Sequence, residues 1–175
     1  MKSWTRIPSP IGDLILIMEE GALREIRFTS GPRPGEPPAD AIEDAKPCKR
    51  TVQQLREYFA GRRRDFDIPL APQGTPFQRR VWDALLAVGY GRTSTYGEIA
   101  RAIGNPKGVR AVGLANGRNP IPIVIPCHRI IGSNGTLTGY GGGLPIKRQL
   151  LELEGVVPVG TRDLFRAAPL AEELS

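Results

Sequence analysis

Residues 75–117, TPFQRRVWDALLAVGYGRTSTYGEIARAIGNPKGVRAVGLANG, decide the fold of the second half of the chain. Thr75 followed by Gln78 is a capping box, a pattern that marks the start of a helix. The apolar side chains that follow recur at helical spacing up to Val88, and Gly89 ends the predicted helix. This part of the chain is therefore predicted to be mostly helical.

Two shorter helices are predicted next. Thr95-Tyr96-Gly97-Glu98 is a second capping-box pattern, and the helix that it starts ends at Gly104. Asn105-Pro106 then predicts the start of another helix, which runs to about Asn116. Two short helices joined by a glycine-containing turn are typical of a helix-turn-helix.

The last of these helices is unusually thin, because its small side chains include Gly108, Ala111, Gly113, Ala115 and Gly117. Small side chains let a backbone approach its neighbour closely. The neighbour is either another helix or the groove of a nucleic acid, for which Arg110 and Arg118 would supply positive charge. Residue types alone leave both interpretations open.

The net charge of +6 is unevenly distributed along the chain. Residues 1–72 and 156–175 are nearly neutral, whereas residues 73–155 hold the whole excess of positive charge. These ranges also form the predicted division into an N-terminal domain, a C-terminal domain and a tail. A basic domain beside a neutral one favours a polyanionic partner such as nucleic acid, although a plain solvated surface has the same composition.

The N-terminal domain reads as α/β. Leu14 to Met18 and Ala22 to Phe28 are predicted strands, separated by a turn at Glu19-Glu20-Gly21. A helix with apolar residues from Val52 to Phe59 follows. Residues 67–74 contain two prolines and form the predicted linker to the helical domain.

Cysteine and histidine counts exclude several classes of protein. Two cysteines cannot make a disulfide scaffold, and with one histidine they cannot fill a four-ligand zinc site. We therefore predict no metal site. The longest apolar run near the N-terminus, Leu14 to Met18, is too short to cross a bilayer. Free cysteines without an export signal predict an intracellular, cytoplasmic protein that does not enter membranes.

The most informative stretch is residues 121–131, IPIVIPCHRII. Its β-branched residues predict a strand that ends at Pro126, directly before Cys127 and the single histidine, His128. A nucleophilic cysteine needs its thiolate form, and either His128 or Arg129 could favour it. On a strand the two adjacent side chains would point to opposite faces, so contact between them requires a turn or a water molecule. A buried, inert cysteine is the alternative.

The segment Ile125-Pro126-Cys127-His128-Arg129-Ile130 resembles the active-site motif of the O6-alkylguanine-DNA alkyltransferases, also called methylated-DNA–protein-cysteine methyltransferases. The resemblance covers Thr75 to Gly155 and is carried also by the segments TPFQ (75–78), YGEIA (96–100), GNP (104–106), RAVG (110–113), NP (119–120), GY (139–140) and LLELEG (150–155). Before residue 73 the chain resembles the family only in layout. The resemblance implies a small sheet plus helix with a ribonuclease-H-like layout, followed by a helix-turn-helix domain.

The resemblance also implies an activity. Such proteins transfer an alkyl group irreversibly from O6-alkylguanine, and from O4-alkylthymine, in duplex DNA to a cysteine, here Cys127, after the base is flipped out. His128 would take the thiol proton through a water molecule, and Glu154 would orient His128. Tyr96 would assist the leaving base, while Asn119 would tie the turn before the reactive strand. The protein would act as a monomer, once per molecule, without a cofactor.

The remaining roles that the resemblance implies concern DNA and the alkyl group. The thin helix would lie in the minor groove, and the DNA contacts would come from Thr95, Tyr96, Arg110, Ala111, Gly113, Ala115, Asn116 and Arg118. The alkyl pocket would be lined by Pro122, Val124, Tyr140, Gly141 and Gly142. Two other functions remain alternatives: a non-catalytic helix-turn-helix DNA-binding sensor or regulator, against which the reactive cysteine argues, and a cysteine hydrolase, against which the basic helical segment argues.

Overall fold

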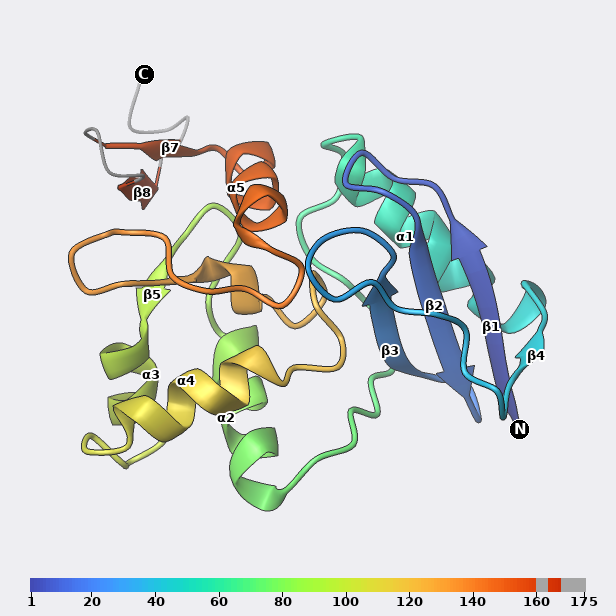
Figure 1. The fold of residues 1–175 in the computed structure, drawn as a ribbon, viewed down its shortest axis with the longest axis horizontal. Helices are drawn as coiled ribbons and strands as arrows, with labels where there is room; N and C mark the ends of the chain where they lie inside the picture. Colours follow the sequence, from blue (N-terminus) through green and yellow to red (C-terminus); the bar gives the residue numbers. More distant parts are fainter. Residues whose placement is uncertain (160–163, 168–175) are drawn as a thin grey trace.

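The computed structural model describes residues 1–159 and 164–167, and its two parts lie side by side (Figure 1). A four-stranded sheet with one helix forms the N-terminal part, and helices around short strands form the C-terminal part. The prediction of an α/β half followed by a mostly helical half is confirmed.

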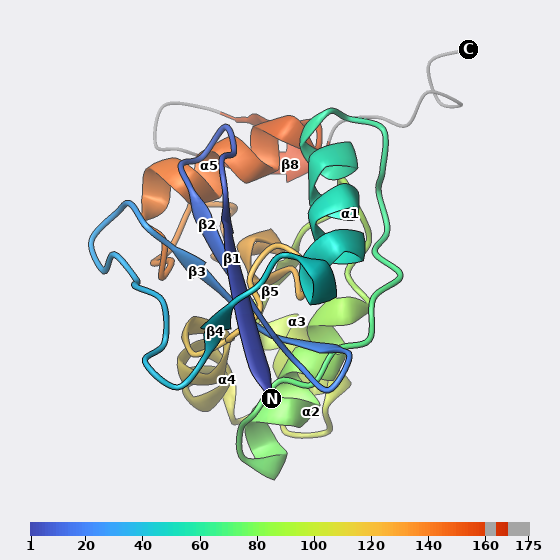
Figure 2. The same cartoon turned by 90° about the vertical axis from the view of Figure 1, so that its right-hand side faces the viewer.

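The N-terminal sheet contains β1 (Lys2–Ile7), β2 (Leu14–Glu19), β3 (Ala22–Phe28) and the short β4 (Ile42–Glu43), in the order β3-β2-β1-β4. β2 pairs with β1 and β3 in antiparallel fashion, whereas β4 runs parallel to β1. A 3₁₀ turn at Lys46–Cys48 leads into α1 (Lys49–Phe59), which covers one face of the sheet (Figure 2).

Local sequence explains the centre of this sheet. Residues 14–17 of β2 are at most 2% exposed, which fits an apolar run buried by packing on both faces. The turn from β2 to β3 has positive φ at Glu20 (50°) and Gly21 (80°). Two-residue hairpin loops of type I′ need this backbone conformation at both positions, because it matches the twist of the flanking strands.

The predicted linker is held against the sheet. The amide of Leu23 in β3 donates to the carbonyl of Pro69 (2.8 Å), and the amide of Ala71 donates back to the carbonyl of Leu23 (2.9 Å). The linker therefore extends the edge of the sheet at β3 before the chain enters the C-terminal part.

The C-terminal part contains α2 (Pro76–Leu86), α3 (Tyr96–Ala102), α4 (Val109–Gly117) and α5 (Leu144–Leu153), with β5 (Ser94–Thr95) parallel to β6 (Ile130–Ile131). The predicted capping box at α2 is present, since Thr75 and Gln78 each accept a hydrogen bond from the other's backbone. The buried indole of Trp82 donates to the carbonyl of Ala115 (2.9 Å) and fastens α2 to α4. Among the residues described, no helix is long and apolar enough to cross a membrane.

One predicted helix boundary is wrong. α4 starts at Val109, not at Asn105-Pro106, because these two residues form a turn that the amide of Gly108 closes by donating to the carbonyl of Asn105 (2.9 Å). Proline suits the second position of such a turn as well as it suits the start of a helix, so the same signal has two outcomes.

The predicted strand before Cys127 is also absent. Residues 121–125 form consecutive turns, in which the amide of Ile125 donates to the carbonyl of Ile121 (2.9 Å) and Ile123 adopts a φ of 75°. Proline at positions 122 and 126 removes two backbone donors that a strand inside a sheet would need. The apolar residues of this segment are therefore buried in an irregular loop.

Of the predicted tail, residues 160–163 and 168–175 lie outside the described residues. In the described remainder, β7 (Val156–Pro158) pairs with β8 (Phe165–Ala167) in antiparallel fashion. Val156 and Phe165 are buried with Ile131 and Leu151, so this part of the tail packs against α5 and β6.

Candidate active site

The thiol of Cys127 lies on a tight turn inside the C-terminal part. Cys127 begins a 3₁₀ turn that ends at Arg129, and the residue is 5% exposed. Asn119 organises the preceding loop, because its side-chain amide donates to the carbonyl of Ile125 (2.8 Å) and its oxygen accepts from the amide of Ile121 (3.0 Å). The thiol is thus presented by a fixed loop instead of a strand.

Burial raises the pKa of the Cys127 thiol above its ordinary value. The Asn119 side chain, the Lys147 ammonium and the Tyr140 hydroxyl act in the opposite direction, because each stabilises a negative sulfur. A thiol in this environment is a neutral S–H at rest, and it needs a base to become a nucleophile.

His128 is the buried base next to this thiol. Its ring is fully buried, and Nε2 lies 2.7 Å from Oε2 of Glu154. The other ring nitrogen, Nδ1, has no hydrogen-bond partner among the residues that the structure describes. Burial lowers the pKa of His128, against the opposing attraction of Glu154, so the ring is neutral near pH 7. When neutral and protonated on Nε2, His128 has Nδ1 available to accept a proton.

Glu154 is the anchor of a dense polar network. Besides His128, the carboxylate accepts from the Arg129 guanidinium (2.8 and 3.1 Å) and from the hydroxyl of Tyr58 on α1 (2.6 Å). Burial alone would raise the pKa of Glu154, but His128 and Arg129 outweigh it and lower the pKa to about 2. Arg129, a candidate activator of Cys127 from the sequence, therefore acts on Glu154 instead.

Lys147 is a second charged group that the sequence patterns did not single out. It lies on the buried face of α5, is fully buried, and donates from Nζ to the carbonyls of Ile130 (2.5 Å) and Thr138 (3.4 Å). Burial lowers its pKa to about 8, while Cys127 opposes this change. Its spacing of three and four residues from Leu150 and Leu151 was the signal, since these leucines mark the apolar face of the helix.

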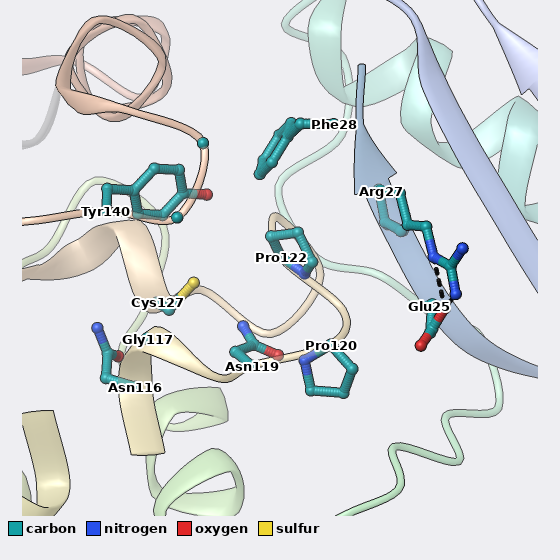
Figure 3. A pocket seen from close by; sticks show the side chains of 13 residues that line it. Glu25, Arg27, Phe28, Asn116, Gly117, Asn119, Pro120, Pro122, Cys127 and Tyr140 are labelled. Carbon is teal, nitrogen blue, oxygen red and sulfur yellow. Dashed lines mark hydrogen bonds and ion pairs between the residues drawn. The ribbon is translucent and has the colours of Figure 1, made fainter. Parts of the chain in front are cut away.

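A cavity of about 230 Å³ opens in front of the thiol. Figure 3 shows the Cys127 sulfur directed into the space between Tyr140 and Pro122. The cavity includes four of the five predicted pocket residues, Pro122, Tyr140, Gly141 and Gly142. Val124, the fifth, does not line this cavity but a separate hollow together with Arg64 and Phe66, so its role in the alkyl pocket stays a prediction. Residues 25–28 of β3, about 100 positions away in sequence, form a wall that no local pattern indicated.

The predicted DNA-contact residues lie on α3 and α4 or at the ends of these helices, and most of them are at least partly accessible. Arg110, Ala111 and Arg118 are exposed, and Thr95 caps α3 by accepting from the amide of Glu98 (3.1 Å). The half-buried Tyr96 hydrogen-bonds through its hydroxyl to Thr138 Oγ1 (2.5 Å), and its ring lies beside Gly113.

Two of the residues predicted to contact DNA are buried in the structure. Ala115 is 3% exposed and lies on the inner face of α4, so its side chain is packed against the protein and is not presented on the surface of the helix. Asn116 is equally buried and lines the cavity instead. Helical geometry explains the difference, because residues 114 and 115 point about 100° apart, and the exposed side chain is Leu114 (66%).

Comparison with known proteins agrees with this site. Residues 76–156 match the DNA binding domain of 6-O-methylguanine DNA methyltransferase, and residues 3–72 match its ribonuclease-like domain. The chain belongs to the 6-O-methylguanine DNA methyltransferase family. Among its relatives, the methylated-DNA–protein-cysteine methyltransferase of Methanosarcina acetivorans is 53% identical over 84% of this chain and 94% of the relative.

Solved structures of this methyltransferase family share the fold. The crystal structure of Mycobacterium tuberculosis O6-methylguanine methyltransferase has a TM-score of 0.81 at 50% identity, over 88% of this chain and 93% of that one. A structure of Mycobacterium tuberculosis OGT in complex with DNA has a TM-score of 0.81 at 49% identity, over 87% and 92% of the two chains.

Proposed function

We propose that this chain takes alkyl groups from O6 of guanine, and from O4 of thymine, in duplex DNA onto the sulfur of Cys127. The chain is a DNA-binding repair protein of the direct-reversal type, a methylated-DNA–protein-cysteine methyltransferase. The observation that carries the assignment to Cys127 is the position of this buried thiol, beside the His128–Glu154 pair and at the wall of a cavity. A non-catalytic DNA sensor needs none of these groups.

The hydrogen-bonded pair of His128 and Glu154 supports a specific mechanism of transfer. His128 Nδ1 takes the thiol proton through a water molecule, and Glu154 stabilises the imidazolium that results. The sulfur attacks the alkyl carbon in line, the S–C bond forms as the C–O6 bond breaks, and the electron pair stays on the guanine oxygen. Tyr96 supplies a proton to the departing base. Water does not cleave the thioether product under mild conditions, so each molecule acts once. The proposed transfer uses a monomer and needs no cofactor.

Binding to DNA is assigned to α3 and α4, used as a helix-turn-helix in the minor groove. Arg110 and Ala111 lie exposed on α4, and the thin helix lets its backbone approach the duplex. A stacked base cannot reach a buried thiol, so the target base has to leave the helix. The C-terminal end of α4, at Asn116 and Gly117, lines the cavity and gives the base its entrance.

The proposal is tested by measuring the mass of the protein before and after reaction with alkylated DNA. The protein is incubated with a duplex that contains O6-methylguanine, and its intact mass is measured with peptide mapping. We expect a stoichiometric gain of one methylene equivalent on Cys127. Binding to the duplex without a gain in mass would identify the chain as a sensor.

Replacing Arg110 by alanine should slow repair of duplex DNA by about 10- to 100-fold, because base flipping costs a few kcal/mol and Arg110 is assigned to fill the gap that the base leaves. The rate with free O6-methylguanine base should hardly change. Arg56→Ala is the matched control, since it removes the same charge from an exposed position on α1. Equal losses on duplex and free base would contradict the assigned role.

The pH dependence of transfer should reflect the buried histidine. Because the pKa of His128 lies below its ordinary value of 6.5, the neutral, proton-accepting ring persists in weak acid. At saturating DNA, the single-turnover rate constant measured from about pH 5 to about pH 8 should fall only below pH 6.5. A midpoint at or above 6.5 would contradict transfer limited by a His128 whose pKa is lowered.

A further inference from the structure

The cavity in front of Cys127 is closed on one side by the N-terminal sheet. Phe28, the last residue of β3, is half-buried and lines the cavity together with its strand neighbours. Its ring centroid lies 5.9 Å from that of Tyr140, at an interplanar angle of 56°. Figure 3 shows Phe28 and Tyr140 on either side of the upper part of the cavity, with the sulfur below them.

Phe28 is held firmly in this position. Its backbone pairs with Leu14 in the sheet, and its carbonyl accepts from the amide of Gly35 (2.7 Å). A Cβ placed on Gly142 would lie 2.9 Å from two ring atoms of Phe28, so the ring is packed directly against the glycine-rich loop. The ring is therefore a fixed wall between the two parts of the chain.

The geometry of the transfer directs the alkyl group toward this wall. In-line displacement places the sulfur, the transferred carbon and O6 on one line, so the other substituents on that carbon project sideways. Asn116 and Gly117 line the cavity at the end opposite to β3, and in the proposed binding mode the base enters beside them. An alkyl chain longer than methyl therefore extends among Pro122, Tyr140 and Phe28.

The volume of the cavity limits the size of the alkyl group that can be accommodated beside the base. A cavity of roughly 150 Å³ is enough for one benzene molecule. The cavity here is about 230 Å³, and it has to hold the fused rings of guanine as well as the alkyl group. Once the purine is inside, the remaining space suits a small alkyl group, and a second aromatic ring would meet the side chain of Phe28.

We propose that Phe28 is a specificity-determining residue, which sets the upper size of the alkyl group that Cys127 accepts. The inference rests on the proposed transfer to Cys127 and adds a residue of the N-terminal sheet to its pocket. Phe28 discriminates between substrates by shape alone, because its ring carries no group that donates or accepts a proton.

The test compares two substrates in one set of variants. Single-turnover rate constants are measured with free O6-methylguanine and free O6-benzylguanine, for the full chain and for Phe28→Ala, Phe28→Leu and Phe28→Trp. We expect Phe28→Ala to raise the benzyl-to-methyl rate ratio at least about tenfold, the size of effect that a small change in an apolar pocket produces. Phe28→Leu should raise the ratio less, and Phe28→Trp should lower it.

Phe77→Leu is the control, because Phe77 packs against the same core without lining the cavity. It should leave the ratio unchanged. A folded Phe28→Ala or Phe28→Leu variant whose ratio equals that of the unchanged chain would overturn the inference. If the unchanged chain itself transfers no methyl group to Cys127, the proposed function fails instead, so the two failures are distinguishable.

Discussion

Replacing Cys127 by alanine is expected to abolish alkyl transfer while leaving DNA binding intact. The transferred carbon ends on sulfur, and no other side chain in the cavity can supply a comparable nucleophile. Cys48 cannot substitute, because burial and the nearby Asp44 raise the pKa of its thiol to about 11 and it lies before α1, outside the cavity. The variant loses one buried sulfur, which should change the free energy of unfolding by about 1 kcal/mol or less.

The measurement is intact mass after incubation with an O6-methylguanine duplex, combined with the Kd for the same duplex. Cys48→Ala is the matched control and should gain mass as the unchanged chain does. Stoichiometric methylation of Cys127→Ala would show that another residue is the acceptor.

Glu154→Gln should produce the largest loss of stability, about 3–5 kcal/mol in the free energy of unfolding. Glutamine keeps the shape but removes the charge that balances the buried Arg129 guanidinium, which is 7% exposed and hydrogen-bonded to both carboxylate oxygens. The transfer rate should also fall, by about 10² or more, because His128 loses the anion that stabilises its protonated form.

The stability effect should depend on pH in a defined direction. The pKa of Glu154 is about 2 in the folded chain, against 4.5 as the ordinary value. Its contribution is therefore fully present above 4.5 and is lost as the pH falls toward 2. Denaturant titrations across this range should show the difference between the unchanged chain and Glu154→Gln shrinking in acid.

Glu152→Gln is the control for this prediction, because Glu152 lies in the last turn of α5, two residues before Glu154. Glu152 is 49% exposed and lies 3.8 Å from Arg148, a surface ion pair whose loss should change stability by no more than about 0.5 kcal/mol. Equal stability of the two variants would mean that the Glu154 network contributes little to the fold.

Elements with a strong local signal were predictable from the sequence. The capping box at Thr75 located the start of α2, and the apolar runs located β2 and β3 to within a residue. The errors fall where proline is ambiguous. Pro106 introduces a turn instead of a helix, and the prolines around residues 121–126 produce a buried loop in place of a strand. The domain boundaries at residues 72 and 155 stay predictions.

The residues of the candidate site also fall into two groups, those that the sequence predicted and those that it did not. Cys127 and His128 were visible as a motif, whereas Glu154 entered through the family resemblance. Phe28 and Tyr58 reach the site by tertiary packing from the N-terminal sheet and helix, and nothing in their local sequence marks them. Predicting such residues requires the relative placement of two parts of the chain, which depends on many weak contacts instead of one pattern.

Hydrogen bonds join the N-terminal part to the reactive half: Tyr58 on α1 donates to Glu154, and the amide of Ile26 in β3 donates to the carbonyl of Pro120 (3.0 Å). For protein engineering, these bonds mean that the helical half would lose contacts at its reactive site if it were produced alone. Cutting the chain at residue 72 would take a donor from the buried carboxylate and a support from the loop that presents the thiol. The sequence indicates two domains with a boundary at residue 72, but the reactive site depends on residues from both sides of that boundary.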